Sequence, residues 1–148
     1  MNFGFTEEQA LLREQVRKFL DEQCPSDEVR RIMQTEPGYN KEHWQQMADL
    51  GWLGLVADPD FGGVGLSWVD LIVVLEEMGR SLCPSPYISH CLAVDTLSKL
   101  GTETQKKTWL SQMASGQCIA VPALLDIPDD PIAGNVVLSA EATDGGIS

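Results

Sequence analysis

The sequence predicts a mainly α-helical fold of about six helices, followed by the beginning of a β structure. Three observations support this prediction. Apolar residues recur three and four positions apart over most of residues 7–114, as on one face of a helix. Capping residues, glycines and prolines divide this stretch into segments of helical length. After Gly116 the pattern changes to short apolar and alternating runs that are typical of strands.

Six helices are expected, over residues 7–22, 27–34, 41–50, 68–79, 87–100 and 103–114. The first and last follow capping-box patterns, Thr6–Gln9 and Thr102–Gln105, in which the two side chains satisfy each other's free backbone N–H groups. Ser67 is the expected N-cap of the fourth, with Asp70 placed to accept from the cap. That helix is apolar on most faces, so we expect it to be the buried central helix.

The remaining helix boundaries follow from single residues. Pro25 ends the first helix, and Ser26 is the expected N-cap of the second. Asn40 is expected to cap the third, and Gly51 ends it in the C′ position, where a left-handed backbone is common. Gly101 ends the fifth.

The C-terminal stretch predicts strands. Residues 118–125 are an apolar run with one proline, residues 136–142 alternate, and Asp144–Gly146 is a turn signal. Two strands and a turn do not form a stable sheet alone, so we expect the chain to stop inside its second structural unit. The predicted domains are an all-helical one over 1–116 and an incomplete β domain over 117–148.

Composition excludes several function classes. The net charge of −12 disfavours nucleic acid, because an acidic chain repels phosphates. We expect no membrane span and no signal peptide, hence a cytoplasmic protein. The four cysteines show no CxxC spacing, which favours reduced thiols, and two scattered histidines predict no metal site.

A glycine-rich stretch, DPDFGGVGLSW at residues 58–68, raises the question of a phosphate-binding loop. It lacks the Gly-Lys-Ser/Thr ending of the Walker pattern, and Trp68 stands where the dinucleotide fingerprint requires its last glycine. Expected helices flank it, whereas both templates follow a strand. We therefore expect a turn in which the glycines permit positive φ and close backbone passage.

Two adjacent acids invite an acid–base interpretation. Glu76 and Glu77 point about 100° apart on a helix, so they cannot converge on one substrate. We expect a structural role, with ion pairing, for Glu76, Glu77 and Arg80.

The order of motifs resembles the N-terminal part of the acyl-CoA dehydrogenases. Four segments carry the resemblance: FTEEQALLREQVRKFL at 5–20, WQQMADLGWLGLVADPDFGGVGLSWVD at 44–70, VLEEMGRSLCPSP at 74–86, and LGTETQKKTWLSQMASGQCIA at 100–120. They cover nearly the whole chain in the order of the family. The acyl-CoA oxidases and flavin monooxygenases share this helical domain.

The resemblance implies an N-terminal helical bundle, a β domain and a C-terminal four-helix bundle, with FAD held between the last two and a neighbouring subunit. The implied reaction is α,β-dehydrogenation of an acyl-CoA thioester, with hydride transfer to FAD and electrons passing to an electron-transferring flavoprotein. The catalytic glutamate of the family lies beyond residue 148, so we name no catalytic residue in this chain and expect it not to be catalytic alone. The implied assembly is a homodimer, a homotetramer or a heteromer with another dehydrogenase subunit.

The resemblance also implies the candidate flavin-facing residues Pro122, Leu124 and Leu125. Leu125 stands where the family usually has a threonine whose hydroxyl meets the flavin, and leucine has no hydroxyl to donate. This departure favours a divergent subfamily, or a partner subunit that leaves the flavin to its mate. The alternative is that these residues belong to a strand that packs under the helices and has no contact with the flavin.

The resemblance places the segment after Pro84 near the acyl pocket, with Tyr87, Ile88 and Cys91 as its candidate lining. Apolar residues at helical spacing are more often plain core, and that alternative stays open. Two other functions also remain open: a non-catalytic partner subunit of a heteromeric dehydrogenase, and a helical interaction domain.

Overall fold

The structure is a computed structural model that describes residues 4–123, 142–143 and 146–147. Its α-helices are α1 (Glu7–Gln23), α2 (Ser26–Met33), α3 (Lys41–Asp49), α4 (Trp68–Ser81), α5 (Tyr87–Leu100) and α6 (Glu103–Ala114). Two 3-10 turns, η1 (Trp52–Gly54) and η2 (Pro59–Phe61), lie between α3 and α4. Strands β1 (Ala142–Thr143) and β2 (Gly146–Ile147) pair antiparallel, with Thr143 opposite Gly146. The predicted helical fold is confirmed.

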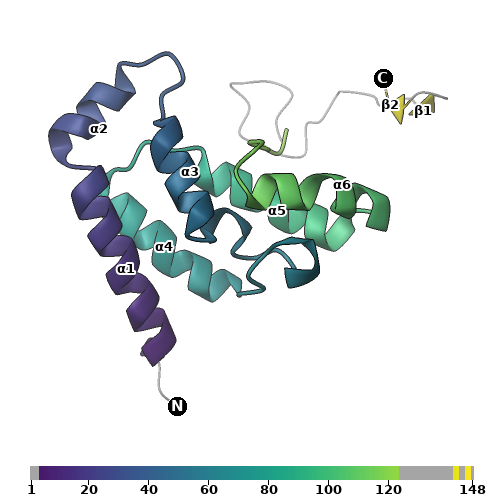
Figure 1. Cartoon of the computed structure of the whole chain (residues 1–148), viewed down its shortest axis with the longest axis horizontal. Helices are drawn as coiled ribbons and strands as arrows, with labels where there is room; N and C mark the ends of the chain where they lie inside the picture. Colours follow the sequence, from purple (N-terminus) through teal and green to yellow (C-terminus); the bar gives the residue numbers. More distant parts are fainter. Residues whose placement is uncertain (1–3, 124–141, 144–145, 148) are drawn as a thin grey trace, which may run out of the picture.

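The helices form two neighbouring pairs, α1 against α4 and α5 against α6 (Figure 1). The turn η1 joins them, because it contacts α3, α5 and α6, and the ring of its Trp52 stands edge-on to Phe19 of α1, with centroids 5.1 Å apart. Its Trp52 and Leu53 are almost fully buried, and the Tyr87 hydroxyl of α5 donates a hydrogen bond of 3.0 Å to the Trp52 carbonyl. The short apolar run after α3 is therefore the centre of the core.

The predicted caps explain where α1, α3 and α6 begin. The Gln9 N–H donates to Thr6 Oγ1, and the Thr6 N–H donates to Gln9 Oε1, which completes the expected capping box. Thr102 and Gln105 form the same arrangement at α6. Asn40 Oδ1 accepts from the first N–H groups of α3.

Two predictions are wrong, one about a helix boundary and one about the burial of a helix. Ser26 is the first residue of α2 rather than its N-cap, because Pro25 is extended (ψ 157°) and its carbonyl accepts the Val29 N–H. Helix α4 is not buried all round, since Val69 and Ile72 are 56% and 52% exposed. Among the described residues, α4 is packed chiefly on the side that faces α1, and its outer side stays open.

The strand predicted over 118–125 does not form over 118–123. The N–H groups of Gln117 and Cys118 bond to the Gln112 carbonyl, and that of Ala120 bonds to His90 Nδ1. These bonds hold the segment against helices instead of a neighbouring strand. Residues 124–125, and all but Ala142 of the predicted strand 136–142, lie outside the described residues.

The glycine-rich stretch is a turn, as expected. Gly62 and Gly65 have φ of 83° and 75°, in the left-handed region that favours glycine. The Gly65 N–H donates to the Ala57 carbonyl, and the Val64 N–H donates to the Gly54 carbonyl, so the stretch folds back against residues 54–57. A Cβ on Gly63 would lie 2.1 Å from the Ala57 oxygen, which shows that the close backbone passage requires glycine there.

Candidate functional site

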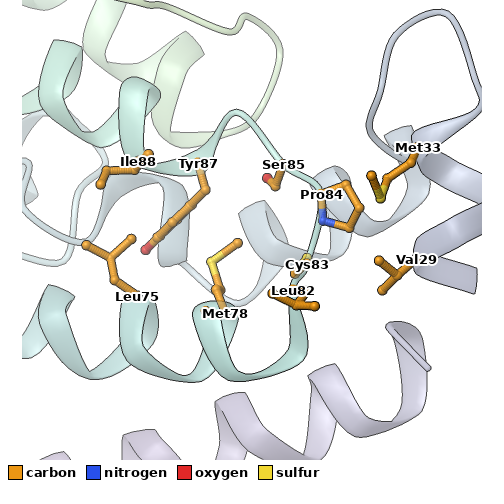
Figure 2. Close-up of a pocket in the computed structure, with 11 residues that line it drawn as sticks. Val29, Met33, Leu75, Met78, Leu82, Cys83, Pro84, Ser85, Tyr87 and Ile88 are labelled. Atoms are coloured by element: carbon orange, nitrogen blue, oxygen red, sulfur yellow. The ribbon is translucent and has the colours of Figure 1, made fainter. Parts of the chain in front are cut away.

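An apolar groove of about 610 Å³ lies between α2, the C-terminal end of α4, the connection 82–86 and the start of α5 (Figure 2). It is lined by Val29, Met33, Leu75, Met78, Gly79, Leu82, Cys83, Pro84, Ser85, Tyr87 and Ile88. None of these side chains carries a charge. The arrangement is suited to an apolar chain and provides no carboxylate or imidazole.

The structure brings two of the three predicted pocket residues to this groove. Tyr87 and Ile88 both line it, with Tyr87 only 1% exposed and Ile88 52% exposed. Cys91 does not line the groove, because it lies one turn further along α5, fully buried in the main core. Burial raises the pKa of the Cys91 thiol to about 12, so this thiol stays protonated at neutral pH.

Sequence reasoning missed the opposite wall. Met33 of α2 and Leu82 after α4 are 69% and 74% exposed, and both line the groove. Leu82 also adopts a left-handed backbone (φ 53°), which turns the chain sharply out of α4 and into the groove wall. The available signal was an apolar residue at the C-terminal end of each of two helices, α2 and α4, which by itself does not predict that these ends meet.

The predicted ion pairing of Glu77 is confirmed beside the groove. Glu77 is 2% exposed and accepts hydrogen bonds from Arg17 (2.9 and 2.7 Å) and Arg80 (2.8 Å). Hydrogen bonding to Arg17, followed by that to Arg80, holds the pKa of Glu77 at about 2, against the opposing effect of burial. Glu76 pairs with Arg13 at the surface. A carboxylate with so low a pKa is a poor general base, so the structural role stands.

The first flavin candidate, Pro122, is partly buried, while Leu124 and Leu125 lie outside the described residues. The segment that leads to Pro122 is held by His90, whose Nδ1 accepts the Ala120 N–H at 3.3 Å. His90 is fully buried and stands edge-on to Trp44, with ring centroids 5.0 Å apart. His90 therefore positions the backbone just before the candidate flavin residues.

The buried His90 predicts acid sensitivity. Burial lowers its pKa from 6.5 to about 4, so the unfolded chain binds a proton between these pH values and the folded chain does not. Stability should therefore fall as the pH drops from 6.5 to 4, by about 3 kcal/mol from this group. Denaturant unfolding of wild type and His90→Gln across this range measures it.

In His90→Gln, the free energy of unfolding should depend much less on pH between 6.5 and 4, since glutamine can still accept the Ala120 N–H but does not titrate. His43→Gln is the matched control, because His43 is 9% exposed and burial lowers its pKa as well. The His43 variant should keep the larger part of the pH dependence of the free energy of unfolding. Equal slopes in wild type and His90→Gln would contradict the assignment.

Other site classes are not supported. Among residues 4–123, 142–143 and 146–147, no group of three or more His, Cys, Asp or Glu side chains is placed to hold a metal ion. In the same described residues, no helix is long and apolar enough to cross a bilayer.

Comparison with known proteins decides the family. Residues 6–117 match the family model described as "Acyl-CoA dehydrogenase, N-terminal domain". The chain belongs to the acyl-CoA dehydrogenase family. The resemblance that the sequence motifs predicted is therefore confirmed, and the helices of the structure are those of this family's N-terminal domain.

Three relatives illustrate the match within the acyl-CoA dehydrogenase family. The chain is 34% identical to mitochondrial isovaleryl-CoA dehydrogenase of Bos taurus, over 92% of this chain and 32% of that protein. It is 32% identical to the acyl-CoA dehydrogenase IpdE2 of Mycolicibacterium smegmatis, over 95% of this chain and 43% of that protein. The ChsE4-ChsE5 complex from Mycobacterium tuberculosis contains a similar fold, with a TM-score of 0.79 and 27% identity over 88% of this chain and 36% of that one. The chain thus spans 32% to 43% of the length of these relatives.

Proposed function

We propose that this chain is the N-terminal part of an acyl-CoA dehydrogenase-like flavoprotein of the cytoplasm. Its reaction would be α,β-dehydrogenation of an acyl-CoA thioester, with hydride transfer to FAD and an electron-transferring flavoprotein as acceptor. The family membership of residues 6–117 supports this reaction class. The chain spans 32% of the length of the first of these relatives, and we propose that other parts of the assembly supply the flavin site and the catalytic base.

The apolar groove is the observation that carries the proposal for this chain's own role. Tyr87 and Ile88 form one wall, and the uncharged lining matches the alkyl or ring system of an acyl group. Cys91 would support that wall from behind, because it is buried in the core one turn along the same helix. We therefore assign Tyr87 and Ile88 to contact with the acyl group.

The same groove supports the absence of a catalytic residue in this part of the chain. Its lining contains no carboxylate, and the nearby Glu77 is fixed between Arg17 and Arg80 with a pKa of about 2. An acyl-CoA α proton is weakly acidic, so its removal requires a carboxylate with a raised pKa that faces the substrate. We therefore propose that the base comes from residues outside those described here.

FAD, when bound, supplies the hydride acceptor. Pro122 has no N–H, so only Leu124 and Leu125 of the three candidates have backbone donors to offer the flavin ring. His90 fixes the approach to this segment through Ala120. This limited donor set favours a flavin held mainly by other domains or by a neighbouring subunit.

A second candidate function is that of a partner subunit in a heteromeric dehydrogenase. The leucine at position 125, where the family usually has threonine, favours it. A related fold occurs in the ChsE4-ChsE5 complex, which contains two different chains. Co-purification with a second dehydrogenase-like chain that retains the threonine would support this candidate, whereas assembly of identical chains with bound FAD would contradict it.

A substitution in the groove tests the proposed acyl contact. Ile88→Trp should lower kcat/KM of the assembled flavoprotein at least about tenfold for long or bulky acyl-CoA, and less than about threefold for short ones, because the indole fills the groove. The matched control is Leu92→Trp, since Leu92 is on the same helix, 37% exposed, and outside the groove lining. Equal losses for all acyl lengths would argue against the groove as the acyl site.

A further inference from the structure

Two thiols from distant parts of the chain meet beside the groove. Cys24 is the C-cap of α1 and Cys83 follows α4, 59 positions later, yet their Sγ atoms lie 3.3 Å apart. Both thiols are free. A disulfide requires sulfur atoms about 2.0 Å apart, so the two need to approach by only a little over 1 Å.

The packing of α1 on α4 explains why these thiols face each other. Paired side chains follow the two helices in parallel order: Gln9 with Asp70, Arg13 with Glu76, Arg17 with Glu77, Asp21 with Arg80, and then Cys24 with Cys83. The last ion pair, between Asp21 and Arg80, has an N–O distance of 2.7 Å and precedes each cysteine by three residues, or about one helical turn. The register in which α1 packs on α4 thus places Cys24 opposite Cys83.

The backbone at both thiols is anchored as well. The Cys24 N–H donates to the Leu20 carbonyl at 2.8 Å, and the Cys83 N–H donates to the Met78 carbonyl at 3.1 Å. Neither cysteine is on a free loop, so the contact is a property of the fold rather than of a chance side-chain orientation.

The two thiols differ in access. Cys83 is partly exposed and lines the groove, where Figure 2 shows it beside Leu82 and Pro84. Cys24 is only 5% exposed and lies behind it in the core. A reagent in the groove can therefore reach Cys83 first, while Cys24 is reached only through Cys83.

We propose that Cys24 and Cys83 are a redox-active dithiol that low-molecular-weight disulfides, such as oxidised glutathione, convert to an intramolecular disulfide. This site goes beyond the proposed dehydrogenase function and does not depend on it. In the first step the Cys83 thiolate attacks the small disulfide, forms a mixed disulfide, and releases one reduced thiol. In the second step the Cys24 thiolate attacks Cys83 Sγ and releases the other.

The exchange balances without another reactant, because the two cysteines lose two electrons and two protons and the small disulfide becomes two thiols. In the reduced pair, hydrogen bonding between the two thiols lowers the pKa of Cys24 and raises the pKa of Cys83. The first attack is therefore assigned to Cys83 because of its exposure in the groove and not because of its acidity. Once formed, the bond would join the end of α1 to the groove wall.

Thiol counting in glutathione buffers of graded oxidation tests the proposal. The chain should fall from four free thiols to two, lose the mass of two hydrogen atoms, and carry no glutathione. Its melting temperature should rise by about 10 °C, because the bond closes a long loop. Trypsin leaves Cys83 and Cys91 in one peptide, residues 81–99, so a further cut after Tyr87 is needed to map the bond.

The controls separate this pair from the other cysteines. Cys24→Ser and Cys83→Ser should each abolish the loss of two thiols, whereas Cys91→Ser and Cys118→Ser should preserve the bond between 24 and 83. The peptide map of the unmodified chain gives the answer even if a variant fails to fold. Four thiols that persist in oxidising buffer, glutathione retained on Cys83, or a bond to Cys91 or Cys118 would each overturn the proposal.

Discussion

Gly63→Ala is expected to lower the free energy of unfolding by about 3–5 kcal/mol, or to prevent folding. A Cβ at this position would lie 2.1 Å from the carbonyl oxygen of Ala57 and 2.6 Å from its Cβ. Ala57 is fully buried, and its carbonyl accepts the Gly65 N–H, so neither side of the turn can move without breaking other contacts. Urea unfolding measured by circular dichroism gives the difference.

Gly79→Ala is the matched control. Gly79 is inside α4, and a Cβ added there would meet nothing within 4 Å, so alanine should raise the free energy of unfolding by about 0.5–1 kcal/mol. If both variants changed stability by similar amounts in the same direction, the close backbone passage at Gly63 would not be the reason for the glycine.

Glu77→Gln is expected to cost about 2 kcal/mol of stability, less than the loss of a fully buried ion pair. The expected loss of stability is smaller because Arg17 and Arg80 are 50% and 43% exposed, so water can solvate both guanidinium groups when the charge of Glu77 is removed. The adjacent Glu76→Gln should cost under about 0.5 kcal/mol, since Glu76 is 57% exposed. The contrast between neighbouring residues separates the buried network from a general effect of charge.

The same network predicts a pH dependence in a lower range than that of His90. The pKa of Glu77 is lowered from 4.5 to about 2, so its contribution is complete above pH 4.5 and is lost as the pH falls toward 2. The difference in stability between wild type and Glu77→Gln should therefore be constant at neutral pH and shrink only in strong acid. A difference that already vanished at pH 6 would contradict the assignment.

The helices were predictable because their signals are local. Thr6, Asn40 and Thr102 each cap the helix that follows, and α5 has the predicted bounds. The exception at Ser26 is also local. The extended Pro25 is the N-cap of α2, and the serine beside it, a residue type common at N-caps, led to the wrong prediction. The structural role with ion pairing that was expected for Glu76, Glu77 and Arg80 is likewise seen in their contacts.

Long-range contacts were not predictable in the same way. Nothing near Met33 indicates that α2 will face Leu82 and Ile88 across a groove, because that contact depends on how α1 packs on α4. The segment after Gly116 has the composition of a strand, yet His90 and the end of α6 take its N–H groups. The meeting of Cys24 and Cys83 likewise appears only when the helices are in register.

Visible absorbance of the flavin tests most directly the claim that this chain shapes the acyl site and carries none of the reacting groups. The purified chain, incubated with FAD and then with an acyl-CoA in the absence of oxygen, should show no bleaching. The same chain assembled with dehydrogenase polypeptides that supply the β domain and the C-terminal bundle should bleach on addition of the acyl-CoA. Bleaching by the chain alone would contradict the claim, and an assembled flavoprotein that never bleaches would contradict the proposed dehydrogenase function.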